Sequence, residues 1–105
     1  MRERESRIGE KMEVVAKDGD DLYRCLLTDI SATGISMTIG HFIPTYKQIG
    51  IVMEIAGEKV AMNGSVRWSI DPGAAWDKKG KLGIFIIDPP PEFLEYVKTR
   101  EKNRG

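Results

Sequence analysis

The segment 60–70 alternates apolar and polar side chains along its whole length, and this pattern constrains the fold more than any other feature. Successive side chains of a strand point to opposite faces of a sheet, so the segment is predicted to be a long, half-buried strand. Glycine inside a strand often marks a bulge or a close approach, and Gly64 is therefore expected to be a bulge or sharp bend. The apolar, inward positions are Val60, Met62, Gly64, Val66, Trp68 and Ile70.

Five shorter segments read as strands, and turn or loop signals separate them. These segments are 12–17, 22–29, 35–39, 49–55 and 82–87. Three prolines at 89–91 end the last one, and Pro91 suits the first turn of a helix. The stripe that follows, with apolar residues at helical spacing, is Phe93, Leu94, Tyr96 and Val97. The chain is therefore predicted to be mainly all-β, a six-stranded antiparallel barrel with a C-terminal helix.

Composition narrows the class of protein. A chain of 105 residues is expected to be one domain. Its 16 basic and 16 acidic residues cancel, which argues against a general nucleic-acid surface. Its one cysteine, Cys25, cannot form an internal disulfide and is expected to be a small buried hydrophobe in a reducing compartment. The charged start is no signal peptide, and no apolar run is long enough to span a membrane, so a cytoplasmic location without membrane insertion is predicted.

No arrangement typical of catalysis is present. The single histidine, His41, stands in a loop without a second metal-binding side chain near it in the sequence, and no paired nucleophile and base is evident. We therefore expect neither an enzyme nor a metal or cofactor site.

The segment 29–34 reads Asp-Ile-Ser-Ala-Thr-Gly between two predicted strands, and Asp, Ser and Gly are all turn residues. An arginine-containing stretch lies some twenty residues before it. With this turn, the arm, the strand series and the Val66-Arg67-Trp68 run, the chain resembles a PilZ domain, the bacterial receptor module for cyclic di-GMP. The resemblance implies a split-barrel topology. Residues 1–10 are predicted to be a flexible arm and residues 11–105 the barrel with its helix.

The resemblance also implies a ligand site on this turn and the arm. Asp29 would accept hydrogen bonds from the Watson–Crick edge of guanine, Ser31 would bond a backbone or phosphate group, and Gly34 would let the ligand approach the main chain. The predicted arm residues that bind phosphate or guanine are Arg2, Arg4 and Arg7, because guanidinium groups make paired hydrogen bonds to both. By parity Trp68 faces the core, and lining the ligand pocket is its alternative role. Whether one or two copies of cyclic di-GMP bind is left open.

The arm departs from the family pattern R-x-x-x-R. Arg7 fits the second arginine, but Glu3 stands at the first position. Arg2 or Arg4 are the possible replacements, since an extended arm tolerates a shift of about one residue, roughly 3.3–3.6 Å. Two functions therefore stay open: a cyclic di-GMP receptor that signals to an unidentified protein in motility or biofilm control, and a degenerate module that acts as an adaptor without the ligand. Single-stranded nucleic-acid binding is the weakest alternative, because the strands lack interleaved aromatic and basic side chains.

Overall fold

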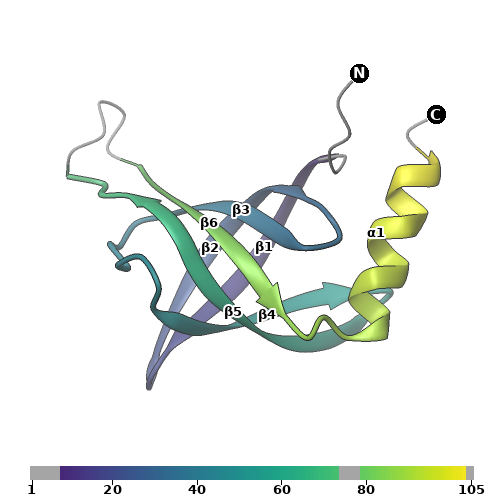
Figure 1. The fold of residues 1–105 in the computed structure, drawn as a ribbon, viewed down its shortest axis with the longest axis horizontal. Helices are drawn as coiled ribbons and strands as arrows, with labels where there is room; N and C mark the ends of the chain where they lie inside the picture. The colour runs from purple at the N-terminus through teal and green to yellow at the C-terminus, as the bar shows by residue number, and fades with distance from the viewer. Residues whose placement is uncertain (1–7, 74–78, 104–105) are drawn as a thin grey trace.

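Six antiparallel strands and one helix follow one another along the chain (Figure 1). The structure is a computed structural model that describes residues 8–73 and 79–103. The strands are β1 (Ile8–Asp18), β2 (Asp21–Ile30), β3 (Gly34–Ile39), β4 (Gln48–Ile55), β5 (Glu58–Ile70) and β6 (Gly80–Ile87), and the helix is α1 (Pro91–Asn103). This confirms the predicted order of elements and the start of the helix at Pro91. Residues 8–10, assigned above to the arm, form the start of β1, whereas the flexible arm over residues 1–7 lies outside the described residues and stays a prediction.

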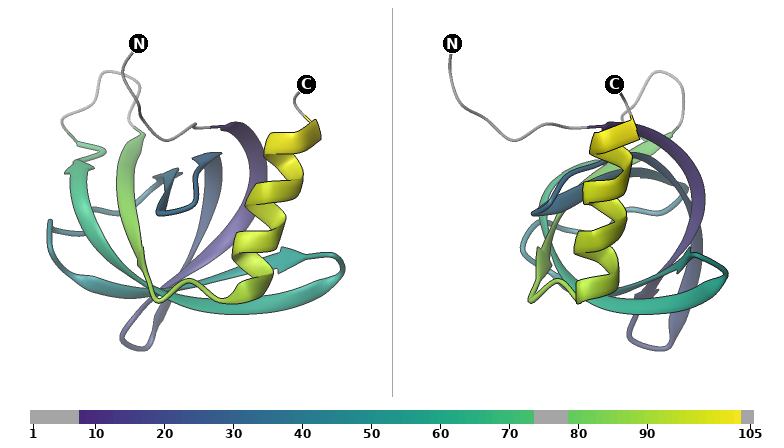
Figure 2. Two further views of the ribbon diagram at one scale, coloured as in Figure 1. Left: turned by 45° about the vertical axis from the view of Figure 1, so that its right-hand side comes forward. Right: turned by 90° about the vertical axis from the view of Figure 1, so that its right-hand side faces the viewer.

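The strands close into a barrel in the order β1-β2-β3-β6-β5-β4, and β4 returns to β1 (Figure 2). The seam between β1 and β4 is short, because only Val15–Lys17 pair with Gly50–Val52. By contrast, β4 and β5 pair from Gln48 with Ser65 to Ile55 with Glu58. A barrel leaves few unpaired strand edges, which is the usual solution for a small antiparallel sheet.

Alternation along the strands supplies the core. The inward side chains of β3 and β4 are the apolar members of each alternating pair, for example Met37 on β3 and Ile51 on β4, which are buried. The helix stands beside the barrel next to β4 (Figure 1) and adds Phe93 and Val97 to this core. Of the predicted helical stripe, Tyr96 is half-buried and Leu94 is exposed. No helix in the described part of the chain has the length and apolar character required to cross a bilayer.

The predicted bulge at Gly64 is wrong. Gly64 pairs in regular register with Ile49 on one side and with Ile86 on the other. A Cβ atom there would lie 2.4 Å from Cγ2 of Ile84, so the missing side chain allows close packing in the barrel interior. The register shift of β5 instead falls between Val66 and Trp68.

Candidate functional site

The turn between β2 and β3 is held together by Ser31. The Ser31 backbone N–H donates to the carbonyl of Gly34 at 2.9 Å, and the Ser31 hydroxyl lies 3.3 Å from both the carbonyl and the N–H of Gly34. The residue is completely buried. Ser31 therefore bonds the backbone, one of its two expected roles, and a contact with phosphate stays a prediction.

Gly34 packs closely against the backbone of β6. A Cβ atom at Gly34 would lie 2.4 Å from the backbone oxygen of Ile84. Within the described chain the glycines with positive φ are Gly19 and Gly57, so a left-handed conformation is not what this position requires. The turn is tied to β6 once more by the Ile86 N–H, which donates to the carbonyl of Thr33 at 2.9 Å. Glycine is thus required here for a close backbone approach.

A β-bulge decides where Asp29 points. The register between β2 and β3 shifts between Leu27 and Asp29, so that Thr28 is the extra residue. In a regular strand Asp29 would share the inward face of Cys25 and Leu27, both of which are buried. The bulge instead leaves Asp29 half-buried at the surface. Bulges often re-aim side chains next to functional sites.

A second bulge, on β5, also changes the face of the sheet to which side chains point. Val66 is buried and pairs with Ile84, but the next pair joins Trp68 to Gly83. Arg67 and Trp68 consequently both face outward, and Trp68 is 45% exposed. The predictions that Trp68 and Ile70 face inward are wrong, because parity fails across a bulge and Ile70 is exposed as well. The alternative role of Trp68 as a wall of a surface pocket fits this position.

The two bulges lie at opposite ends of one cross-strand row. Asp29 on β2 pairs with Ser36 on β3, Ser36 pairs with Gly83 on β6, and Gly83 pairs with Trp68 on β5. The indole rests directly on Gly83, where a Cβ atom would overlap the ring. Neighbouring strands are about 4.8 Å apart, so the row spans roughly 14 Å across the outer face of the barrel.

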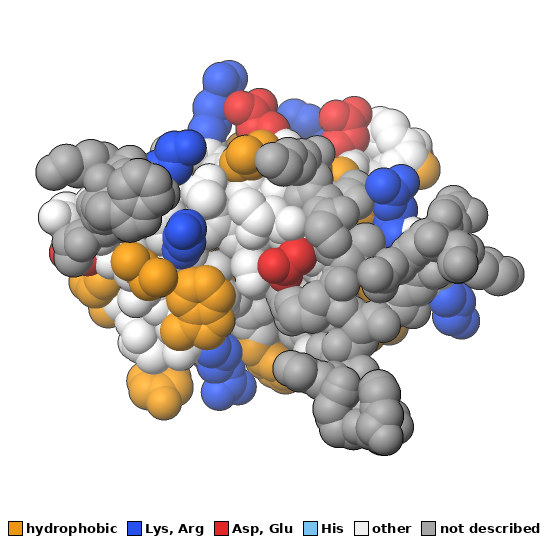
Figure 3. All heavy atoms as spheres, turned by 90° about the horizontal axis from the view of Figure 1, so that it is seen from above, with side chains coloured by type: hydrophobic (Ala, Val, Ile, Leu, Met, Phe, Trp, Pro, Cys, Tyr) orange, Lys and Arg blue, Asp and Glu red, His pale blue; other side chains and the backbone are white. Residues whose placement is uncertain are grey.

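A hollow of about 440 Å³ opens over this row. Its lining runs from Asp29 on β2 through Gly34 and Ser36 on β3 to Phe85 on β6 and to Arg67 and Trp68 on β5, and the Trp68 indole covers Gly83. The volume falls within the range of small-molecule sites, about 300–1,000 Å³. In the view from above, hydrophobic side chains gather next to Lys or Arg side chains on the molecular surface (Figure 3). Exposed aromatic side chains and one carboxylate across the hollow suit a planar ligand with hydrogen-bond donors on one edge.

The structure brings four of the predicted site residues together at this hollow or at the turn beside it, namely Asp29, Ser31, Gly34 and Trp68. Arg2, Arg4 and Arg7 lie outside the described residues, and their roles stay predictions. Sequence reasoning did not assign Arg67, Gly83 and Phe85 to the site. Arg67 directly precedes Trp68 in the sequence, but the signal that both face outward is the bulge, which appears only when the strands are paired.

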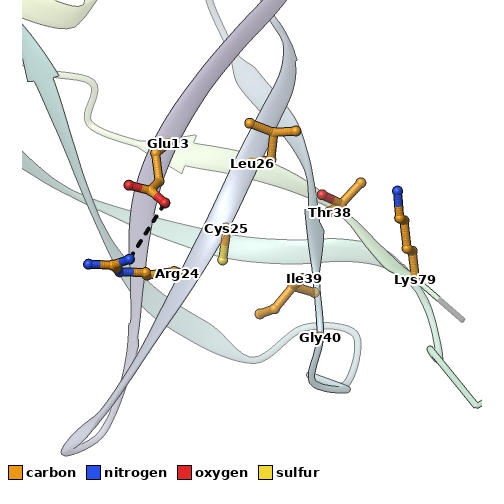
Figure 4. A pocket seen from close by; sticks show the side chains of 8 residues that line it. All are labelled: Glu13, Arg24, Cys25, Leu26, Thr38, Ile39, Gly40 and Lys79. Atoms are coloured by element: carbon orange, nitrogen blue, oxygen red, sulfur yellow. Dashed lines mark ion pairs between the residues drawn. The ribbon is translucent and has the colours of Figure 1, made fainter.

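A second, smaller hollow of about 280 Å³ lies where the ladder between β2 and β3 ends (Figure 4). Arg24 and Glu13 stand on one side of it and form an ion pair, with Nη1 of Arg24 4.0 Å from Oε2 of Glu13. Lys79 stands on the other side (Figure 4). Cys25 is buried beneath it, and burial raises the pKa of its thiol to about 11. This confirms the expected buried cysteine, which stays a neutral thiol near pH 7. Of the predicted ligand-binding residues that the structure describes, none lines this hollow.

Comparison with known proteins identifies the fold and the family. The family model described as PilZ domain matches residues 1–96. No curated protein matches the sequence. The fold is similar to the Bacillus subtilis inhibitor of motility (MotI/DgrA), with a TM-score of 0.75 and 19% identity over 99% of this chain. The chain spans about half of that protein, 53% of its length.

Two isolated domains are similar over nearly their whole length. One is the PilZ domain of YcgR from Escherichia coli, solved with cyclic di-GMP, with a TM-score of 0.69 and 12% identity over 99% of this chain and 95% of that one. The other is the PilZ domain of CeSA from a cellulose-synthesizing bacterium, with a TM-score of 0.62 and 15% identity over 95% of this chain and 99% of that one.

Proposed function

This chain belongs to the PilZ domain family, and from that premise we propose that it binds cyclic di-GMP and relays the signal to a protein partner. The observation that carries the proposal is the row from Asp29 to Trp68, because two bulges turn a carboxylate and an indole to opposite ends of one hollow. PilZ domains are receptor modules rather than enzymes, and the similar domain of YcgR was solved with this ligand.

Each part of the hollow has a counterpart on the ligand. A guanine lying beside Gly34 and Ser36, over the β3 part of the hollow, places its N1–H and N2–H₂ donors toward Asp29, which accepts both. Trp68 and Phe85 offer aromatic faces on the far side, and stacking of a base on an aromatic side chain contributes about 1–3 kcal/mol. The phosphates require cations, which the arm residues Arg2, Arg4 and Arg7 would supply.

The proposed setting is the bacterial cytoplasm, with motility or biofilm formation as the controlled process. The similarity to an inhibitor of motility supports the first of these processes. Glu3 supports a second candidate function, an adaptor that does not bind the ligand, because a negative side chain at the first arginine position repels phosphate. The downstream protein is unidentified in either case.

Titration calorimetry with cyclic di-GMP tests the proposal on the wild-type chain and on Asp29→Ala. Two charge-assisted hydrogen bonds at about 1.5–3 kcal/mol each predict a loss of affinity of at least about a hundredfold. Asp20→Ala, which removes an exposed carboxylate from the β1–β2 turn, is the matched control and should bind normally. The isotherm of the wild type also shows whether one or two copies bind.

Circular dichroism shows whether the variant remains folded. If folded Asp29→Ala binds as well as the wild type, the site is wrongly assigned. If the variant unfolds, Asp29 is a structural residue. A wild-type chain that does not bind at millimolar ligand favours the adaptor.

A further inference from the structure

Arg67 stands at the end of the hollow that lies farthest from Asp29. The bulge between Val66 and Trp68 turns its side chain outward, although Val66 before it is fully buried. The Arg67 guanidinium lies over the ring of Phe85, 4.9 Å from the ring centroid. Contacts of this kind hold a guanidinium plane in place while leaving its N–H groups available to a second partner.

The charges around the hollow make Arg67 distinctive. Among the described residues that line it, Asp29 is the only anion and Arg67 the only cation. The two ion pairs found between described residues, Arg24 with Glu13 and Lys47 with Asp18, do not include Arg67. A phosphate placed in this hollow would meet repulsion at Asp29 and attraction at Arg67.

The length of the hollow indicates which part of a ligand reaches Arg67. Asp29 on β2 and Arg67 on β5 are separated by three strand intervals, roughly 14 Å. That span is longer than one base. When Asp29 holds the Watson–Crick edge of a guanine, the ribose–phosphate end of the nucleotide extends toward β5.

We propose that Arg67 binds a phosphate of the ligand and supplies the cation that Glu3 does not provide on the arm. The inference rests on the proposed receptor function. It assigns to the barrel itself a phosphate contact that the family pattern places on the preceding arm. The guanidinium already lies over the Phe85 ring, so the contact does not require the arm to be ordered first.

The test is calorimetric titration of the full chain with cyclic di-GMP, comparing wild type, Arg67→Ala, Arg67→Lys and Arg24→Ala. Arg67→Ala should bind about tenfold or more weakly, because charge-assisted bonds to phosphate are strong. Arg67→Lys should recover part of the affinity, since it keeps the charge without the planar fork. Arg24→Ala is the matched control, an exposed arginine outside this hollow, and should bind as the wild type does.

Salt dependence separates a phosphate contact from a packing role. Removing a phosphate contact should make the affinity of Arg67→Ala fall less steeply with added salt than that of the wild type. A weaker affinity with an unchanged salt dependence would mean that Arg67 acts on the base or only supports Phe85, and would overturn the assignment. Wild-type affinity in Arg67→Ala would overturn it as well, with the receptor function intact. Absence of wild-type binding would overturn both.

Discussion

Replacing Gly34 by alanine tests whether the glycine of the Asp29–Gly34 turn is required by the barrel itself. The added Cβ would lie 2.4 Å from the backbone oxygen of Ile84, whereas ordinary contacts begin at 3.4 Å. The backbone of β6 cannot rotate away as a side chain can, so β3 and β6 must separate locally by about 1 Å. Hydrogen bonds of the usual length, about 2.9 Å, do not survive that separation.

The expected cost follows from these distances. Losing one or two backbone hydrogen bonds costs about 0.5–1.5 kcal/mol each, and strain from overpacking adds about 1–3 kcal/mol. We therefore expect the free energy of unfolding to fall by about 2–4 kcal/mol. In a domain of this size each kcal/mol corresponds to about 4–8 °C in Tm, so Tm should fall by about 10–25 °C.

Thermal unfolding followed by circular dichroism measures the change, and Gly40→Ala is the matched control. A Cβ atom at Gly40 meets nothing within 4 Å, and its φ is not positive, so this variant should stay within about 0.5 kcal/mol of the wild type. Equal Tm values for the two variants would refute the argument from close approach. The glycine would then be explained by access for the ligand instead.

Two further predictions concern the arm and the buried thiol. Glu3→Arg should raise the affinity for cyclic di-GMP by about tenfold in calorimetry at low salt, since it removes a negative charge and restores the family spacing to Arg7; an unchanged affinity would show that residue 3 does not face a phosphate. Burial raises the pKa of Cys25 from 9.0 to about 11, so its contribution to stability is fully present below pH 9 and is lost as the pH rises toward 11. Urea unfolding measured between pH 9 and pH 11 should show the free energy of unfolding falling as the pH rises. The Cys25→Ala variant should show a smaller fall over the same pH range.

The Asp29–Gly34 turn shows how much of the site could be predicted from the sequence. The resemblance led to Asp29, Ser31 and Gly34, and the structure places all three at one turn beside one hollow. Ser31 is buried and bonds the backbone of Gly34, which is one of its two expected roles. Gly34 has a structural reason that the sequence did not indicate, since its missing side chain makes room for the backbone of β6.

The order of the elements and most of the core were determined by the sequence alone, with Trp68 and Ile70 beyond the β5 bulge as the exceptions. Alternation in 60–70 predicts a strand whatever it pairs with, and Pro91 can begin a helix in any context, because these preferences belong to the local backbone. Only the tertiary structure decided that the side chains of Asp29, Arg67 and Trp68 point out of the barrel. A bulge is a mismatch between two paired strands, so its position depends on the register of β3 and β6 and not on the residues of β2 and β5 alone. The same is true of Gly34 and Gly83, whose need for glycine comes from atoms that are distant in the sequence.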